Sequence, residues 1–238
     1  EGSLGGKARG LAFMNSMLVK YCQYAKYENV RVTIPRTVVV ATDYFDAFIR
    51  NNGLEYVLTT EMTDEEILSE FVSSTIPVKL QRELKAYIKT VSTPLAVRSS
   101  SKLEDSHYQP FAGIYSTYMI PYVDNGDQML RLLLKAVKSV YASVYFATSR
   151  AYLSSSQNLI SEEKMAVIIQ EVCGTEQDGL FFPTFSGVAR SINYYPIGDE
   201  APADGVCNIA MGLGKLVVDG GRTLRFSPRY PQKVLQTS

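Results

Sequence analysis

The apolar positions of this chain repeat first with the spacing of helices and later with the spacing of strands. Between residues 7 and 28 they predict a helix with one apolar face, made of Leu11, Met14, Leu18, Tyr21 and Ala25. A second stripe predicts the longest helix, over residues 125–155, with buried positions at Met129, Leu133, Val137, Val140 and Val144. Capping residues and apolar spacing predict shorter helices over 42–49, 63–72 and 77–91.

Short apolar runs bounded by glycine and proline predict the strands. They lie within residues 30–42, 95–100, 114–122, 164–173, 187–195 and 205–214. Residues 217–228 predict a hairpin around the turn Asp219-Gly220-Gly221. The chain is thus helix-rich up to Pro94 and strand-rich afterwards. We expect a mixed α+β fold with a helix-rich subdomain over 1–94 and a strand-rich subdomain over 95–238.

Composition narrows the class of protein. The 238 residues are 46% hydrophobic and 20% charged with a formal net charge of zero, so nothing favours nucleic acid or a membrane as partner. The three cysteines lack metal-ligand spacing and favour a reducing compartment, from which we expect a cytoplasmic protein. No apolar run has the length of a membrane span. The glycine-rich start without methionine suggests a domain of a longer protein.

Lys7 lies where a glycine-rich loop becomes the first predicted helix, in the segment Gly-Gly-Lys-Ala-Arg-Gly at 5–10. Unbonded backbone N–H groups and the positive end of the helix dipole favour an anion at such a position, and lysine adds a full charge. The segment is therefore a candidate phosphate contact. A glycine-rich helix start without any ligand gives the same pattern, and the Walker A spacing is absent.

Arg98 ends an apolar strand and is followed by three serines at 99–101. The rigid, permanently charged guanidinium fork suits a polyphosphate, and serine hydroxyls with the backbone near Gly113 would complete the contact. Glu104 and Asp105 would then orient the arginine or hold a cation. The alternative is an arginine–carboxylate pair that stabilises a surface loop, and the pattern leaves both open.

Three further features carry weaker signals. Gln170 ends the apolar strand 165–172, which would offer an adenine-sized slot or be only a strand end. The glycines at 212–214 permit close approach of the backbone to another group. His107 is the only histidine, and no neighbour in the sequence would orient its ring. We therefore expect no catalytic residue in this chain.

Taken together and in order, six segments resemble the nucleotide-binding N-terminal domain of phosphoenolpyruvate synthase and pyruvate phosphate dikinase. This is the PEP/pyruvate-binding domain, a relative of ATP-grasp proteins. Each segment alone is a weak signal, and their order along nearly the whole chain makes the resemblance specific. The segments are GGKARGL (5–11), AVRSSSKLED (96–105), FAGIYSTY (111–118), AVIIQEV (166–172), SGVAR (186–190) and GLGKLVVDGG (212–221).

The resemblance implies a two-lobed, ATP-grasp-like fold that holds ATP between its lobes, here truncated at its C-terminal end. Carried over by position, Lys7 and Arg98 would contact the ATP phosphates. Gly113 and Thr117 would shape the cover over those phosphates, and Gln170 would lie at the edge of the nucleotide. The resemblance also implies Mg²⁺, with ligands beyond the end of this chain, and partner domains that carry a phosphohistidine and bind pyruvate.

Two segments depart from the family pattern. Lys215 stands where the family commonly has glutamate, and ARSINYYP (189–196) replaces its Phe-Thr-x-x-Pro. Two functional hypotheses follow. In the first, the chain is the ATP-binding domain of a phosphoenolpyruvate synthase-like phosphotransferase, a kinase-type enzyme that moves phosphoryl from ATP to histidine to pyruvate, and is inactive alone. In the second, it is a diverged nucleotide-binding regulatory or scaffold module on the same fold.

Overall fold

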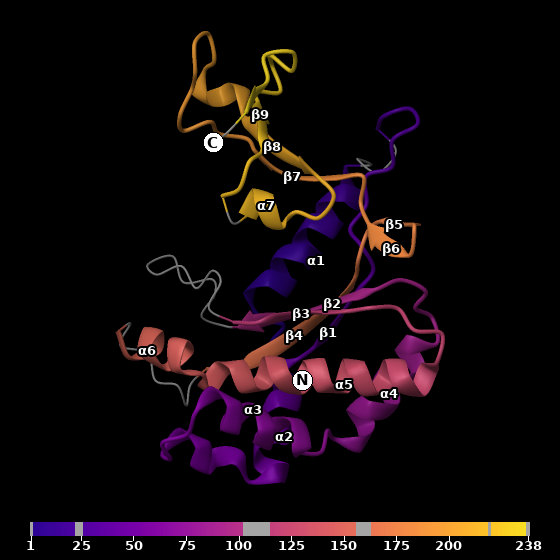
Figure 1. The fold of residues 1–238 in the computed structure, drawn as a ribbon, viewed down its shortest axis with the longest axis vertical. Coiled ribbons are helices and arrows are strands. Elements are labelled where there is room, and N and C mark those ends of the chain that lie inside the picture. The colour runs from indigo at the N-terminus through magenta and orange to yellow at the C-terminus, as the bar shows by residue number, and fades with distance from the viewer. Residues whose placement is uncertain (1, 22–25, 102–114, 156–162, 219, 237–238) are drawn as a thin grey trace. The chain divides into compact units, whose positions relative to one another are not determined.

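The chain folds into two compact units, Glu1–Val172 and Cys173–Ser238. The computed structural model in Figure 1 describes residues 2–21, 26–101, 115–155, 163–218 and 220–236. Among the described residues, no helix has the length and apolar character needed to cross a bilayer. Cys173 and Cys207 are free thiols.

Unit 1 holds most of the helices and a four-stranded sheet. Its helices are α1 (Gly5–Lys20), α2 (Thr42–Asn52), α3 (Asp64–Ser73), α4 (Val78–Ile88), α5 (Gly126–Ala142) and α6 (Ala147–Ser155), with 3₁₀ turns η2 (Leu54–Leu58) and η4 (Ser143–Tyr145). Its strands are β1 (Thr37–Val40), β2 (Leu95–Ser101), β3 (Thr117–Ile120) and β4 (Met165–Glu171). The sheet is antiparallel, in the order β1-β4-β2-β3.

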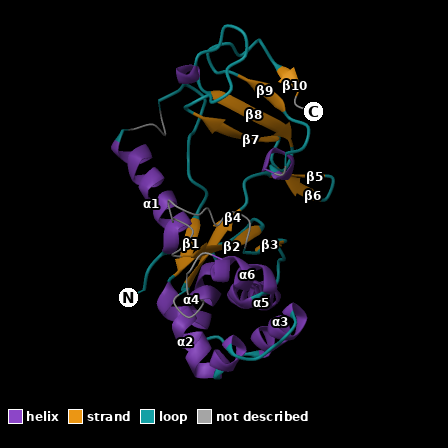
Figure 2. Ribbon diagram, turned by 90° about the vertical axis from the view of Figure 1, so that its left-hand side faces the viewer, coloured by secondary structure: helices purple, strands orange, loops and turns teal. Residues whose placement is uncertain are grey.

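Side chains on one face of this sheet form the core. Directly opposed residues of antiparallel strands point to the same face, and alternate residues share it. The core members of the sheet all fall on one face by this rule: Val40, Leu95, Val97, Ile120, Met165, Val167 and Ile169. Helices α2 to α5 pack on that side, while Figure 2 shows α1 leaving the sheet on the other. We call this second face the open face: Thr117 and Met119 of the edge strand β3 are exposed on it, while Ala166 and Ile168 of β4 are buried.

The sequence places a subdomain boundary near residue 94, whereas the compact units divide after Val172. The reason lies in strand pairing. β1, which precedes residue 94, pairs along its whole length with β4, and β4 also pairs with β2. Because these hydrogen bonds join both sides of residue 94 into one sheet, the helix-rich and strand-rich parts of unit 1 share one core.

Local signals explain where several helices begin. α3 starts with a capping box, in which Thr63 Oγ1 accepts from the Glu66 N–H and the Glu66 carboxylate accepts from the Thr63 N–H. α5 starts at Asn125, whose side-chain oxygen accepts from the Gln128 N–H at 2.9 Å. The predicted stripe of α5 from Met129 to Val140 is buried, as expected.

The single helix expected over 125–155 is wrong, because the chain forms α5, η4 and α6 in succession. Phe146 has extended backbone angles and ends the 3₁₀ turn. Buried serine hydroxyls stabilise this corner: Ser143 Oγ donates to the Val140 carbonyl at 2.7 Å, and Ser149 Oγ donates to the Ser143 carbonyl at 2.6 Å. Such bonds compete with helical pairing of the backbone.

The apolar face expected for α1 is also not a buried face. Met14 and Tyr21 are 47% and 53% exposed. The buried residues of α1 are Gly5, Gly6 and Ala8, because the first turns of the helix are the ones held against β2.

Unit 2 contains a two-stranded hairpin and a second antiparallel sheet. The hairpin joins β5 (Thr175–Gln177) to β6 (Leu180–Phe182) through Asp178 and Gly179, both with positive φ as an Asp-Gly hairpin turn requires. The sheet has the order β10-β9-β8-β7, from β7 (Phe185–Arg190), β8 (Val206–Met211), β9 (Leu224–Phe226) and β10 (Leu235–Gln236). A 3₁₀ turn, η6 (Pro202–Asp204), precedes β8.

The hairpin expected over residues 217–228 is not formed. Lys215–Val218 are the short helix α7, and β9 pairs with β8 and β10 instead. The glycine-rich turn therefore connects a helix to a strand.

Candidate functional site on the open face of the unit 1 sheet

Three of the residues predicted to bind nucleotide lie on the open face of the unit 1 sheet. Arg98 of β2 is directly opposite Thr117 of β3, so their side chains share a face. Gln170 of β4 is opposite Ala96, which is two residues from Arg98 and therefore on the same face. This is the face opposite the helical core. Thr117 is exposed, and Arg98 and Gln170 are half-buried.

The N-terminus of α1 is attached to the same face by Ser100. Ser100 Oγ donates to the Leu4 carbonyl at 2.8 Å and accepts from the Ala8 N–H at 3.1 Å. By strand alternation Ser100 shares the face of Arg98. Gly5 has a φ of 69°, and a Cβ added there would lie 1.9 Å from the Ser100 carbonyl oxygen. Only glycine permits this approach of helix to strand.

Lys7 reaches the strand beside Arg98. Its Nζ donates to Ser99 Oγ at 3.2 Å and to the Ser99 carbonyl at 3.4 Å, across 92 residues of sequence. The structure thus places Lys7 against the residue that follows Arg98 in β2. By strand alternation the side chains of Ser99 and Arg98 leave β2 on opposite faces of the sheet. Lys7 thus contacts Ser99, the first of the three serines that follow Arg98 in the sequence.

The Arg98 guanidinium makes no hydrogen bond or ion pair with any residue that the structure describes. A half-buried guanidinium has five N–H donors and keeps its charge at all physiological pH values. On a partly open sheet face, such a group favours an anionic ligand with several acceptor oxygens. Glu104, Asp105, His107 and Gly113, which the sequence analysis also names, lie outside the described residues.

A hydrogen-bond chain holds Gln170 at the end of β4. Gln170 Nε2 donates to Thr37 Oγ1 at 3.0 Å, and Thr37 Oγ1 donates to the Pro35 carbonyl at 2.8 Å. The next residue, Glu171, forms an ion pair with Arg36, which also donates to the Thr90 carbonyl. Thr37, the first residue of β1, and Arg36 before it therefore hold the side chains of Gln170 and Glu171 at the end of β4.

The phenol of Tyr87 lies close to the Arg36–Glu171 ion pair. Burial and the Glu171 carboxylate, opposed by Arg36, together raise the pKa of Tyr87 to about 12. The phenol therefore stays neutral at physiological pH.

A hollow of about 320 Å³ adjoins this end of the sheet, between α1 and the segment that leads into β1. Its walls are mainly apolar, and Thr37 and Val39 contribute to it from the open face. Small and apolar side chains of α1, among them Ala8 and Leu11, form the facing wall. Neither the sequence pattern nor the residue types flag this hollow, because it depends on where α1 lies over the sheet.

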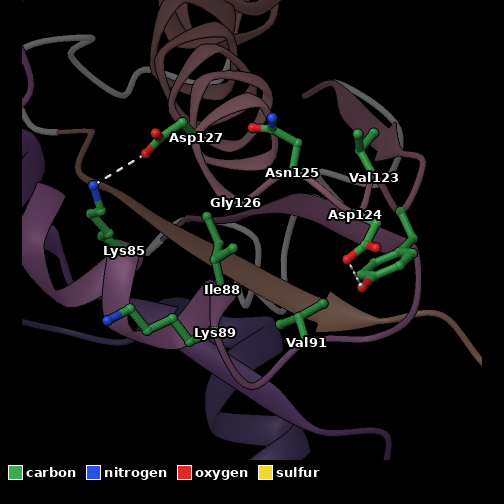
Figure 3. Close-up of a pocket in the computed structure, with 10 residues that line it drawn as sticks. Lys85, Ile88, Lys89, Val91, Val123, Asp124, Asn125, Gly126 and Asp127 are labelled. Carbon is green, nitrogen blue, oxygen red and sulfur yellow. Dashed lines mark hydrogen bonds and ion pairs between the residues drawn. The ribbon is translucent and has the colours of Figure 1, made fainter.

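A second hollow, of about 230 Å³, lies between α4 and the start of α5 (Figure 3). Lys85 and Lys89 line it together with Asp124 and Asp127. Lys85 Nζ lies 3.1 Å from Asp127 Oδ1, so the charge of this lysine is already matched. Two carboxylates make this hollow a poorer site for polyphosphate than the open face, and none of the predicted site residues lines it.

In unit 2, the segment that departs from the family pattern is an ordered loop. The buried Arg225 makes two hydrogen bonds to the Glu200 carboxylate, at 2.9 and 2.6 Å, and one to the Tyr195 carbonyl at 3.2 Å. Asn193 Nδ2 donates to the same carboxylate at 2.8 Å. Hydrogen bonding to Arg225 lowers the pKa of Glu200 to about 2. Lys215, the other departure, begins α7 and is exposed.

The described residues contain no group of three or more histidine, cysteine, aspartate or glutamate side chains that could hold a metal ion.

Comparison with known proteins places these features in a family. The model of the pyruvate phosphate dikinase AMP/ATP-binding domain matches residues 1–233. An uncharacterized phosphotransferase, YvkC of Bacillus subtilis, is 26% identical over 193 residues, covering 80% of this chain and 20% of the relative. The phosphoenolpyruvate synthase of Aeropyrum pernix is 26% identical over 238 residues, covering 91% of this chain and 25% of the relative.

The chain thus spans a quarter or less of the length of these curated relatives. The family match covers almost all of both units, including α1 with Lys7, the sheet with Arg98 and Gln170, and strands β7 to β9 of unit 2. This chain therefore belongs to the pyruvate phosphate dikinase AMP/ATP-binding domain family.

Proposed function

We propose that the open face of the unit 1 sheet binds ATP, with Lys7 and Arg98 against the phosphates. The observation that carries this proposal is the half-buried Arg98, which lacks a partner among the described residues and lies next to the residue that Lys7 contacts. Two cations at neighbouring positions of β2 would match the charge of a polyphosphate. In phosphoryl transfer, such groups contribute by neutralising charge on the phosphoryl oxygens.

The remaining residues of the proposed site have distinct roles. Thr117, opposite Arg98 on β3, and Gly113, four residues earlier in the sequence, would shape the cover over the phosphates. Gln170 would face the nucleoside, because it lies on the same face, nearer to β1 and its hollow. We also propose that the two units correspond to the two lobes of an ATP-grasp-like fold.

At the level of the full-length protein, we propose a phosphoenolpyruvate synthase-like phosphotransferase. ATP would donate a phosphoryl group to a histidine of another domain, and from there the group would pass to pyruvate. The phosphoenolpyruvate synthase relative supports this proposal. The chain alone would bind nucleotide without transferring phosphoryl, and Mg²⁺ ligands would come from elsewhere in the protein. A cytoplasmic location stays a prediction.

Isothermal titration of ATP against the full-length protein tests the site. Lys7→Ala and Arg98→Ala should each weaken ATP binding by roughly 10- to 100-fold, the worth of a hydrogen bond to a charged group. Lys79→Ala and Arg82→Ala provide matched controls, since both side chains are exposed on α4 and lie away from the open face. ATP affinity that is equal in Lys7→Ala, Arg98→Ala and the controls would contradict the proposal.

A further inference from the structure

The orientation of the Gln170 side-chain amide is determined by one proton on Thr37. A threonine hydroxyl has a single proton to donate. Thr37 Oγ1 uses that proton on the Pro35 carbonyl, at 2.8 Å, because a carbonyl oxygen can only accept. Toward Gln170, at 3.0 Å, the hydroxyl must therefore act as acceptor, and only the amide nitrogen Nε2 can donate to it.

The opposite orientation of the amide is disfavoured. It would place the carbonyl oxygen Oε1 of Gln170 against a lone pair of Thr37 Oγ1. Two acceptor oxygens would then face each other at about the distance that now separates Nε2 from Oγ1. Thr37 could relieve this contact only by giving up its bond to the Pro35 carbonyl. The directly opposed backbone positions of Thr37 and Gln170 keep the two side chains adjacent.

Fixing Nε2 on Thr37 leaves Oε1 as the group that Gln170 can offer to a ligand. Within the described part of the chain, Oε1 accepts no hydrogen bond. Gln170 is half-buried on the same sheet face as Arg98, so a ligand that contacts the guanidinium can extend toward it. A glutamine amide can donate through Nε2 or accept through Oε1, and here the bond from Nε2 to Thr37 leaves Oε1 as an acceptor for a ligand.

We propose that Thr37 is a specificity-determining residue, which makes Gln170 select a hydrogen-bond donor on the nucleoside. This inference rests on the proposed ATP site. Two groups of ATP supply such a donor near a base-binding residue: the 6-amino group of adenine and the ribose hydroxyls. Inosine triphosphate carries an acceptor oxygen in place of the amino group, and 2′-deoxy-ATP lacks one hydroxyl. The site discriminates against at least one of these analogues.

The test measures dissociation constants of ATP, inosine triphosphate and 2′-deoxy-ATP on the full-length protein. The wild type should prefer ATP over one analogue by roughly three- to tenfold, the value of one neutral hydrogen bond. Preference over inosine triphosphate identifies the 6-amino group as the donor, and preference over 2′-deoxy-ATP identifies the ribose hydroxyl.

Thr37→Val keeps the branched side chain but removes the acceptor, so the amide becomes able to turn either way. The ratio of the analogue's dissociation constant to that of ATP should then fall toward one. Thr37→Ser, which keeps the hydroxyl, should restore the wild-type ratio. Thr59→Val is the matched control, because Thr59 also bonds a nearby carbonyl, that of Tyr56, but is exposed and far from the sheet in sequence. Thermal unfolding of each variant separates a binding effect from loss of the fold.

Two results overturn the inference while leaving the ATP site intact. One is a wild type that binds ATP and both analogues equally. The other is a folded Thr37→Val variant that keeps the wild-type preference. Absence of ATP binding in the wild type would instead overturn the ATP site and this inference with it.

Discussion

Lys7 Nζ lies 3.2 Å from Ser99 Oγ, although 92 residues separate them in the sequence. The contact joins the first helix to the strand that carries Arg98. The Lys7–Ser99 contact depends on the close approach of Gly5 to Ser100. Gly5 and Lys7 lie in the first turn of α1, and Ser99 and Ser100 are neighbours in β2, so a shift of the helix start would move both pairs. The position of the lysine charge is therefore set by backbone packing, which can be tested apart from the charge itself.

Replacement of Gly5 by alanine should destabilise unit 1 strongly and weaken ATP binding. The new Cβ would lie 1.9 Å from the Ser100 carbonyl oxygen, and the φ of 69° is strained for alanine. We expect a loss of about 2–4 kcal/mol in the free energy of unfolding, measured by urea titration.

Gly10→Ala is the matched control in the same helix. A Cβ there meets nothing within 4 Å, so alanine should stabilise the helix by about 0.5–1 kcal/mol. Equal stability of the two variants would contradict the packing argument.

Ser100→Ala should destabilise the junction between α1 and β2. The fully buried hydroxyl bonds both the Leu4 carbonyl and the Ala8 N–H, and its loss leaves these backbone groups without that partner. We expect a cost of about 1–3 kcal/mol in urea unfolding. Ser73→Ala removes an exposed hydroxyl that bonds the Glu70 carbonyl and should cost far less. A Ser100→Ala cost no greater than that of Ser73→Ala would show that the junction does not depend on this side chain.

The Glu200–Arg225 pair should make the stability of unit 2 depend on acidic pH. The pKa of Glu200 is lowered from 4.5 to about 2 in the folded chain, so the folded state favours the ionised carboxylate. Its contribution is fully present above pH 4.5 and is lost as the pH falls toward 2. Thermal unfolding between pH 5 and pH 2 should therefore show a flatter pH dependence in Glu200→Gln than in the wild type.

Asp199→Asn is the control for this titration. Asp199 pairs with Lys233 at 2.7 Å, but both side chains are largely exposed, so solvent screens the pair. If Glu200→Gln retains the full acid sensitivity of the wild type, the loop is not held by the ionised carboxylate.

The isolated chain should bind ATP without consuming it. In the proposed reaction the phosphoryl acceptor lies on another domain, so this chain incubated with ATP should release neither AMP nor ADP above the uncatalysed rate. Nucleotide chromatography measures this directly. Turnover by the isolated chain that is lost in Arg98→Ala would show that it holds an acceptor or activates water by itself.

Local sequence patterns predicted much of the secondary structure. The capping residue Thr63, the stripe of α5 and the apolar runs of β2 and β4 all act over a few residues, and the structure bears them out. The errors have tertiary causes. Residues 125–155 have helical spacing throughout, yet buried serine bonds end the helix at a corner, and the glycine-rich turn near residue 220 joins a helix to a strand.

In the candidate site, too, some residues could be found from the sequence and others only from the tertiary structure. Lys7, Arg98, Thr117 and Gln170 were singled out from the sequence by residue type, by position in their segments and by family resemblance. Nothing in the sequence flagged Thr37 or Ser100 as partners of these residues. Their hydrogen bonds to Gln170 and to the start of α1 span 133 and up to 96 residues.

By itself, the sequence determined most of the segments that form helices and strands, which residue types suit a polyphosphate, and which family the chain resembles. These properties depend on neighbouring residues and on order along the chain. Only the tertiary structure decided that Arg98, Thr117 and Gln170 share the face opposite the core, that Lys7 meets the same strand, and which way the Gln170 amide points. Strand pairing and helix packing set these relations, because they bring together groups that no local pattern connects.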